Sequence, residues 1–241
     1  MEIEIDDEEG SEVPRQSLLD IVLEHKQKQG KARLEDRITI LAKTNEMQED
    51  DEEIRDYFFD LFDLSTTDEE SCTGIILVYP TAAVIVIEAK QSILWDVLKR
   101  LNKSELDNAP VNTLAILSSS EDISKRAFNM PYSTFLNEAS AAATLIEDSE
   151  KLVAAASAAN ISILQLGEKL SSLSGDEAQN LLLNLRSSFT TFPTQETFSA
   201  IIEADDTPTV NKFLDFFGKP VDVTLDTEIA WPAPEALEAY L

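Results

Sequence analysis

The residues with the most capacity for chemistry in this chain are its carboxylates, which concentrate in two segments. Residues 2–12 hold seven acids and no base, and residues 46–70 hold twelve acids and one arginine. Carboxylates are good calcium ligands, but an EF-hand loop also requires a glycine at its sixth position. No glycine occurs between Gly30 and Gly74. Both segments are therefore predicted to be solvated acidic stretches without a metal site. For residues 2–12 the alternative, which we favour less, is a tether to a basic surface.

Residues that could act as a nucleophile or a base are few, because His25 is the only histidine and Cys72 the only cysteine. Nucleophilic catalysis needs a nucleophile with a base within hydrogen-bond reach. Neither residue has a candidate partner nearby in the sequence, and His25 is expected to be a surface residue. The six glycines have none of the spacings of a phosphate-binding loop. We predict no catalytic, cofactor-binding or metal-binding residues, and no enzymatic activity.

The formal net charge of −27 limits the surfaces that this chain can bind. Nucleic acid and anionic membranes repel so acidic a protein, so neither is an expected partner. A single cysteine excludes an internal disulfide framework and suits a reducing compartment. The sequence contains no secretory signal and no apolar run long enough to span a membrane, which predicts an intracellular protein.

The elements that would position any site are arranged around residues 73–101, where the sequence predicts a strand, a tight turn, a strand and a helix. The apolar runs 75–79 and 82–87 are the two strands, and Ser92 is expected to cap the helix. Both runs are apolar at nearly every position. We therefore expect both faces of these strands to be covered.

Three further elements complete an α+β pattern. Residues 37–43 alternate as a half-buried strand does, and residues 111–117 form another apolar, strand-like run. Between the first strand and the central unit, apolar residues follow helical spacing at Ile54, Tyr57, Phe58, Leu61 and Phe62. The order strand, helix, strand, strand, helix, strand predicts a ferredoxin-like sandwich, with helices on one face of an antiparallel sheet.

The central segment resembles the BLUF family, in which threonine and glycine open the second strand and a glutamate stands near the end of the third. Thr73, Gly74 and Glu88 match this pattern. Residues 125–130 are similar to the arginine-x-phenylalanine signature near the end of the family's domain. The resemblance covers about residues 37–135 and implies a BLUF-like form of the ferredoxin-like fold.

The same resemblance implies that the flavin of the BLUF photoreceptors is absent. In those proteins a tyrosine, a glutamine and an asparagine contact the flavin, and Ala42, Ile85 and Thr67 stand at or near these positions here. The polar edge of a flavin would meet hydrocarbon and carboxylates instead of hydrogen-bond donors, which is costly. We expect no flavin and no other cofactor.

In this domain, in size and in its missing flavin contacts, the chain resembles the testis-expressed protein 47 family and related ciliary or flagellar proteins. That resemblance implies a place in the axoneme of a cilium or flagellum, with larger axonemal proteins as partners. Tubulin is itself acidic, so direct binding to the bare tubulin lattice is not expected of a chain with this charge.

The C-terminal half is rich in alanine and leucine. Segments 137–159 and 161–173 are predicted to be helical. Further helices are predicted to start at Gly175, at Thr194 as a cap, and at Thr207 as a cap followed by proline. These helices either cover the free face of the sheet, which we favour, or dock on another protein.

The sequence thus divides into an acidic arm with a short helix (1–30), a BLUF-like domain (31–136), a helical region (137–219) and an extended tail (220–241). The tail either lies in a groove of a partner or folds back onto its own domain. Aromatic side chains often carry much of the energy of an interface. The candidate partner contacts are therefore Phe213, Phe216, Phe217, Trp231 and Tyr240.

Together these features predict a non-catalytic structural or adaptor component of the axoneme that acts through protein–protein contacts. One alternative is a sensor domain that binds a small, flavin-like molecule, which would give a coloured protein. Another is a cytosolic dimerisation module of the roadblock type, which would form a stable homodimer.

Overall fold

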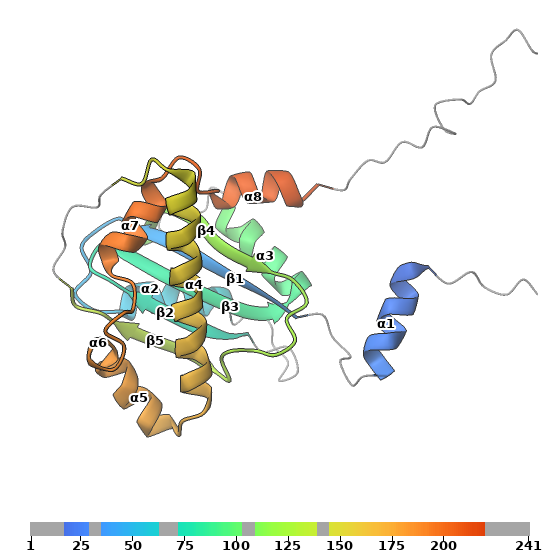
Figure 1. Ribbon diagram of the computed structural model, residues 1–241, viewed down its shortest axis with the longest axis horizontal. Helices are drawn as coiled ribbons and strands as arrows, with labels where there is room; N and C mark the ends of the chain where they lie inside the picture. The colour runs from blue at the N-terminus through green and yellow to red at the C-terminus, as the bar shows by residue number, and fades with distance from the viewer. Residues whose placement is uncertain (1–16, 29–34, 63–71, 103–108, 139–144, 220–241) are drawn as a thin grey trace, which may run out of the picture.

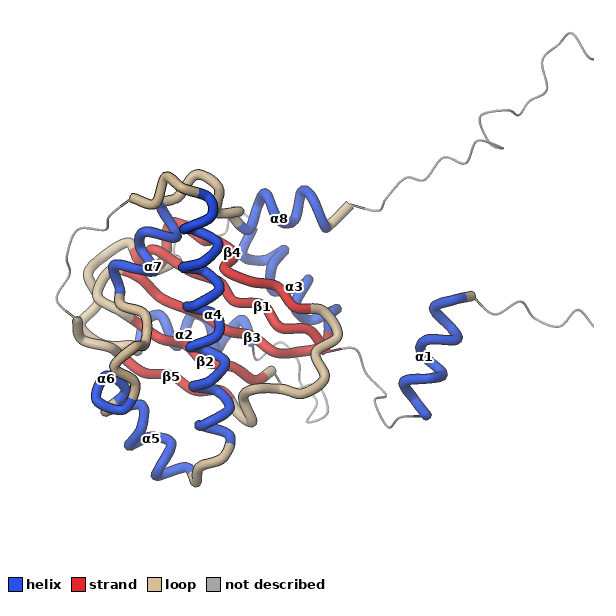
Figure 2. Tube along the Cα trace, viewed as in Figure 1, coloured by secondary structure: helices blue, strands red, loops and turns tan. Residues whose placement is uncertain are grey.

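The computed structural model describes residues 17–28, 35–62, 72–102, 109–138 and 145–219, which form a sheet with helices on both faces and a separate N-terminal helix (Figures 1 and 2). The strands are β1 (Glu35–Thr44), β2 (Thr73–Val78), β3 (Ala82–Lys90), β4 (Val111–Ser120) and β5 (Pro131–Phe135). The helices are α1 (Leu18–Lys28), α2 (Glu52–Phe62), α3 (Gln91–Asn102), α4 (Ser149–Ser171), α5 (Gly175–Leu183), α6 (Leu185–Ser188), α7 (Gln195–Glu203) and α8 (Val210–Phe217).

The strands lie in the order β4-β1-β3-β2-β5. The first four are antiparallel neighbours, whereas β5 pairs in parallel with β2. Four antiparallel strands in this order, with α2 and α3 as connections, form the ferredoxin-like arrangement. The predicted α+β fold class is confirmed. The sequence does not reveal β5, because this five-residue strand opens with a proline and carries only weak alternation.

One face of the sheet packs against α2, α3 and α8 and forms the first core. Side chains along a strand point alternately to opposite faces, and in β3 it is Ala83, Ile85 and Ile87 that face this core. Ile54 and Phe58 of α2 are fully buried against them. The apolar stripe predicted for α2 is therefore confirmed at Ile54, Tyr57, Phe58 and Leu61, and the side chain of Phe62 lies outside the described part.

The other face packs against α4, α5, α6 and α7 and forms the second core. Val84 and Val86 of β3 face this core, and α4 runs across it in Figure 1. The ring of Phe198, from α7, lies 5.7 Å from the ring of Tyr79. Both faces of the central strands are covered as predicted, and the helices α4–α7 pack internally.

Helix α4 is one continuous helix, whereas the sequence suggested two segments beginning at residue 137. Leu145 and Ile146 precede it in a non-helical stretch. The side chain of Asp148 accepts hydrogen bonds from two backbone N–H groups of the first turn, which explains the start at Ser149.

Two predicted caps are also wrong. Ser92 lies inside α3, because β3 runs directly into that helix. Helix α8 is capped by Thr209, whose hydroxyl accepts a hydrogen bond from the backbone N–H of Lys212. The hydroxyl of Thr207 instead donates to the carbonyl of Ile201, at 2.6 Å.

Candidate protein-binding surface

Helix α8 lies beside α3 and is anchored to the sheet at its first residues (Figure 1). The N–H of Ile116 in β4 donates to the carbonyl of Pro208 at 2.8 Å, and an isolated bridge joins Thr209 to the same strand. This pairing holds the residues before α8 extended. Val210 and Leu214 are buried in the first core. One side of α8 is therefore fixed to the domain.

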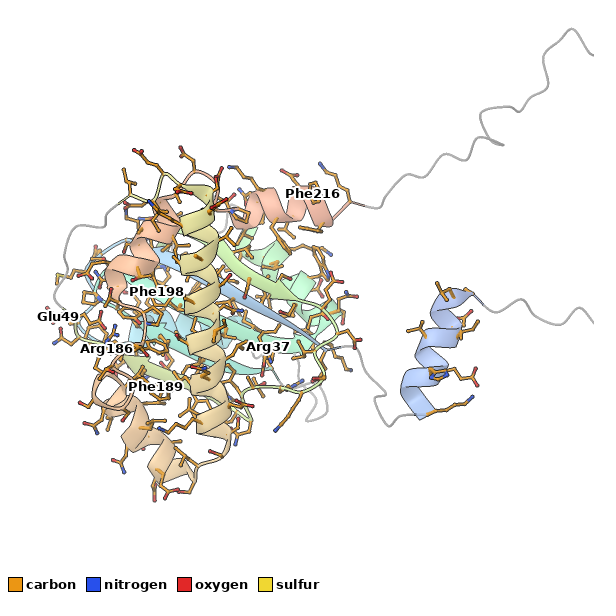
Figure 3. The ribbon with its side chains drawn as sticks, in the orientation of Figure 1. Arg37, Glu49, Arg186, Phe189, Phe198 and Phe216 are labelled. Atoms are coloured by element: carbon orange, nitrogen blue, oxygen red, sulfur yellow. The ribbon has the colours of Figure 1, made fainter. Side chains whose placement is uncertain are left out.

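Four aromatic side chains of α3 and α8 form a continuous patch, which we call the aromatic surface: Trp95, Phe213, Phe216 and Phe217. The rings of Trp95 and Phe213 are 6.1 Å apart and inclined by 27°. The ring of Phe217 lies 4.8 Å from that of Phe213 and 4.9 Å from that of Phe216, which Figure 3 labels. Rings at these separations attract one another, so they form one surface and not four isolated contacts.

The exposure of these rings increases along α8. Phe213 is half-buried against the first core, whereas Phe217 is 56% exposed and Phe216 is 78% exposed. Single exposed apolar residues are common, but a contiguous exposed aromatic patch is typical of an interaction site. The sequence thus indicated three of the four residues.

Trp95 is the member that the sequence reading missed. It lies at the border of the buried stripe of α3, beside Leu94, and is half-buried against the first core. An aromatic residue at the border of an amphipathic helix was the available signal. Trp231 and Tyr240, the other candidate contacts, lie outside the described residues.

The charges around the aromatic surface differ from those of the whole chain, which has 46 acids and 19 lysines and arginines. Helices α3 and α8 and the two residues after α8 carry only two acids, Asp96 and Asp215, and two further acids, Asp36 and Glu121, line the recess beside Trp95 and Phe213. The same helices and following residues carry four bases, which we call the basic rim: Lys99, Arg100, Lys212 and Lys219. Lys99 pairs with Asp96 at 3.9 Å and Lys219 with Asp215 at 3.4 Å. Lys212 and Lys219 are four residues before and three residues after Phe216, which places them on the same side of the helix end.

The residues that resemble the BLUF pattern form a buried hydrogen-bond network around Glu88, which is fully buried in β3. Its carboxylate accepts hydrogen bonds from Arg37 Nε at 2.6 Å and from the Thr73 hydroxyl at 3.3 Å. It also accepts from the backbone N–H groups of Ala127 and Phe128, at 2.8 and 3.0 Å. Three strands and the segment before β5 therefore meet at one ion pair.

The glycine of the same pattern is required by close packing. Gly74 has φ +153°, and a Cβ there would lie 1.9 Å from the carbonyl oxygen of Val86 in the neighbouring strand. The matching residues thus account for how strands β2 and β3 pack and are held to the loop before β5. Thr73 also lines a surface pocket of about 370 Å³ beside Arg126 and Asn129.

The positions expected to lack flavin contacts lie in hydrocarbon. Ala42 and Ile85 are fully buried in the first core, among the residues that α2 and α3 cover. Thr67 lies outside the described residues. The absence of a flavin stays a prediction.

The remaining candidate chemistry is dispersed. His25 is exposed on α1, and Cys72 is buried beside β2. Among the described residues, no three His, Cys, Asp or Glu side chains gather as a metal site would require. Burial raises the pKa of Tyr79, whose hydroxyl donates to the carbonyl of Pro193 at 3.3 Å, so this phenol stays protonated.

Two surface pockets flank α4. One of about 620 Å³ lies between the residues before α4 and helix α7, and includes Leu145 and Thr197. The other, of about 440 Å³, lies between α4 and the segment before β5, and includes Arg37 and Lys125. The Nε of Arg37 is already bound to Glu88 and its Nη2 to the carbonyl of Lys125, at 3.3 Å. In the first pocket the hydroxyl of Thr194, the N-cap residue of α7, donates to the carboxylate of Glu196 at 2.9 Å.

None of the helices in the described ranges has the length and apolar character that a membrane crossing requires.

The sheet order defines a ferredoxin-like α+β protein, extended by helices that cover the second face of its sheet. The chain belongs to the testis-expressed protein 47 family, whose model matches residues 34–219. No curated protein sequence matches it.

Several solved structures of BLUF proteins are similar over part of the chain. BlsA in its ground state is 15% identical, with a TM-score of 0.34 over 67% of this chain and 92% of that one. The BLUF protein BlrB is 13% identical, with a TM-score of 0.32 over 42% and 74%. A bacterial light-regulated adenylyl cyclase is 20% identical, with a TM-score of 0.36 over 44% of this chain, which spans only 30% of the cyclase.

Proposed function

We propose that this protein is a non-catalytic adaptor that binds a partner protein through the aromatic surface. The observation that carries the proposal is the exposure of Phe216 and Phe217 on a helix whose opposite side, through Val210 and Leu214, is buried in the domain. Truncating such aromatic anchors commonly costs an interface about 2 kcal/mol or more. A fixed helix also loses little conformational entropy when a partner binds.

The chemistry of the surface indicates the kind of partner. Apolar side chains are needed to cover the rings, and acidic side chains complement the basic rim. An amphipathic helix with acids along its edges meets both requirements. The acidic surface of the rest of this protein would repel such a helix. The basic rim therefore also determines where on the surface the helix binds.

For the partner and its location, we propose a larger axonemal protein in a cilium or flagellum. Support comes from the resemblance to flavinless BLUF-like proteins of cilia and from membership of the testis-expressed protein 47 family. The acidity of the chain supports a protein partner over the bare tubulin lattice or nucleic acid.

The test is crosslinking mass spectrometry on isolated cilia that carry either the natural chain or a Phe216→Ser/Phe217→Ser variant. We expect reproducible crosslinks from Lys212 and Lys219 to one axonemal protein, and their loss in the variant. The matched control is Val153→Ser/Leu183→Ser, which removes two apolar side chains of similar exposure from α4 and α5.

Three results would contradict the proposal. Crosslinks that survive in the Phe216→Ser/Phe217→Ser variant would place the partner elsewhere. Purified protein that absorbs blue light as flavins do would favour the sensor alternative. A stable homodimer that persists in the variant and is absent from washed axonemes would favour the dimerisation module.

A further inference from the structure

Helix α1 carries a second exposed apolar surface in the described part of the chain. Leu18 is 78% exposed, Ile21 45% and Val22 41%. These residues are three and four positions apart and therefore lie on one side of the helix. Figure 1 shows α1 standing apart from the sheet and its helices. An amphipathic helix of 11 residues is marginal alone in water, so its apolar stripe needs a surface to cover.

The chain connects α1 to the neighbourhood of the aromatic surface. Six residues separate Lys28, the end of α1, from Glu35, the start of β1. Glu35 pairs with Lys90, which directly precedes α3. A connection of this length spans at most about 25 Å. Since Trp95 lies in the second turn of α3, the aromatic surface is within reach of α1 of the same molecule.

Charge favours the same surface. Residues 2–12, which precede α1, contain seven acids and no base. The basic rim is the place on α3 and α8 where such a segment is attracted, while the acids elsewhere on the chain repel it. The outer side of α4, which also exposes Val153 and Ile161, has no charged residue between Lys151 and Glu168 and offers no such attraction.

We propose that α1 docks on the aromatic surface of its own molecule, with Leu18, Ile21 and Val22 against the rings of Phe216 and Phe217. The docked helix covers both exposed apolar patches at once. The regulatory consequence rests on the proposed function: a partner that binds the aromatic surface must displace α1. Docking of α1 then lowers the affinity of the aromatic surface for its partner.

A weak contact is enough for this docking. A short tether gives α1 an effective concentration of about 1 mM at the aromatic surface. A dissociation constant of about 0.25 mM for the untethered helix would then reduce the population with a free aromatic surface about fivefold. A partner competing with α1 would bind about fivefold more weakly than to a chain without the helix.

The test is hydrogen–deuterium exchange on the full natural chain and on an Ile21→Gln/Val22→Gln variant, without any partner. Glutamine is a good helix former, so the variant keeps α1 helical and removes only its apolar stripe. We expect backbone amides at the end of α8 and in the second turn of α3 to exchange about fivefold faster in the variant. The matched control is Glu24→Gln, which lies outside the apolar stripe of α1 in an exposed ion pair with Lys28 and should leave the exchange of α3 and α8 as in the natural chain.

Unchanged exchange of α3 and α8 in the variant would overturn the proposal, and so would a change confined to α4. A paired-cysteine experiment separates docking within one molecule from docking between two. In a Cys72→Ala chain, Leu18→Cys with Phe216→Cys should form a monomeric disulfide faster than Glu24→Cys with Phe216→Cys. Covalent dimers would show that α1 docks on a second copy and would contradict the proposal as stated.

These outcomes are independent of the proposed function, because neither experiment contains a partner. If α1 does not dock but the crosslinks of α8 to an axonemal protein depend on Phe216 and Phe217, the adaptor proposal stands alone. If α1 docks and no such crosslinks occur, the aromatic surface is an internal contact.

Discussion

At the scale of single residues, the buried ion pair between Glu88 and Arg37 gives a structural role to residues that resemble the BLUF pattern. Glu88 accepts four hydrogen bonds, two of them from backbone N–H groups that precede β5. Removing one partner of a buried pair leaves the other charge uncompensated, which costs far more than the pair contributes as a whole. The network thus holds the β5 segment against the sheet.

We therefore expect Glu88→Gln to lower the free energy of unfolding by about 3 kcal/mol, because Arg37 loses its counter-charge in a buried site. Urea unfolding followed by circular dichroism measures this. Glu203→Gln is the matched control, since Glu203 forms an ion pair with Lys43 in which both side chains are more than a third exposed. That change should cost less than about 0.5 kcal/mol. Equal losses would refute the structural role given to Glu88.

Gly167 makes a second residue-scale prediction. A Cβ at this position of α4 would lie 2.8 Å from Cζ of Phe128, which is fully buried in the second core. Alanine improves helix propensity by about 1 kcal/mol, but overpacking costs about 1–3 kcal/mol, so Gly167→Ala should destabilise by about 1 kcal/mol. Gly175→Ala, where nothing lies within 4 Å, should not destabilise. In a Phe128→Leu background the penalty at Gly167 should disappear; if it persists, the ring is not its cause.

At the scale of elements, α8 combines a structural side and an interaction side. Leu214 is buried in the first core and Phe213 is half-buried against it, whereas Phe216 is mostly exposed to solvent. The phenylalanines of α8 thus differ in role: Phe213 contributes to the core, and Phe216 is available for binding. The sequence places all three phenylalanines at helical spacing but does not tell which of them the sheet covers.

This division predicts unequal effects of alanine substitution. Phe213→Ala should lower the free energy of unfolding by about 2 kcal/mol, because it opens space beside Trp95. Phe216→Ala should change it by less than about 0.5 kcal/mol, because the ring is mostly exposed. Thermal unfolding of the two variants in parallel measures the difference. A loss at Phe216 as large as that at Phe213 would show that its ring is buried in solution.

At the scale of the whole molecule, the sheet depends on helices from both parts of the chain. Its first face is covered mainly by α2 and α3, from between the strands, but its second face is covered by α4–α7, from after them. A sheet with one bare apolar face is prone to aggregation. The predicted boundary at residue 136 therefore divides two parts of the chain that differ in composition but pack together in the second core.

A fragment of residues 31–136 should accordingly lack a cooperative thermal transition and elute as aggregates in size-exclusion chromatography. Residues 17–219 should unfold in a single transition, with the same midpoint by far- and near-ultraviolet circular dichroism. A monomeric, cooperatively folded 31–136 fragment would show that the helical region is a separate domain.

The sequence by itself determined the local elements whose patterns repeat within a few residues. These elements include the apolar runs of β2 and β3, the apolar stripe of α2, and the first four strands in their order along the chain. They can be predicted because the periodicity of apolar side chains shows which face of a strand or helix is buried. The resemblance in Thr73, Gly74 and Glu88 added the BLUF-like form of the fold.

Only the tertiary structure decided the features that join distant segments. Glu88 meets Phe128 across 40 residues, β5 is a strand because β2 offers it an edge, and α8 starts at Val210 because β4 holds Pro208 extended. Which aromatic rings stay exposed is likewise settled by what packs on the other side of the helix. Local spacing carries no information on such contacts, because they depend on how the whole chain closes around its two cores.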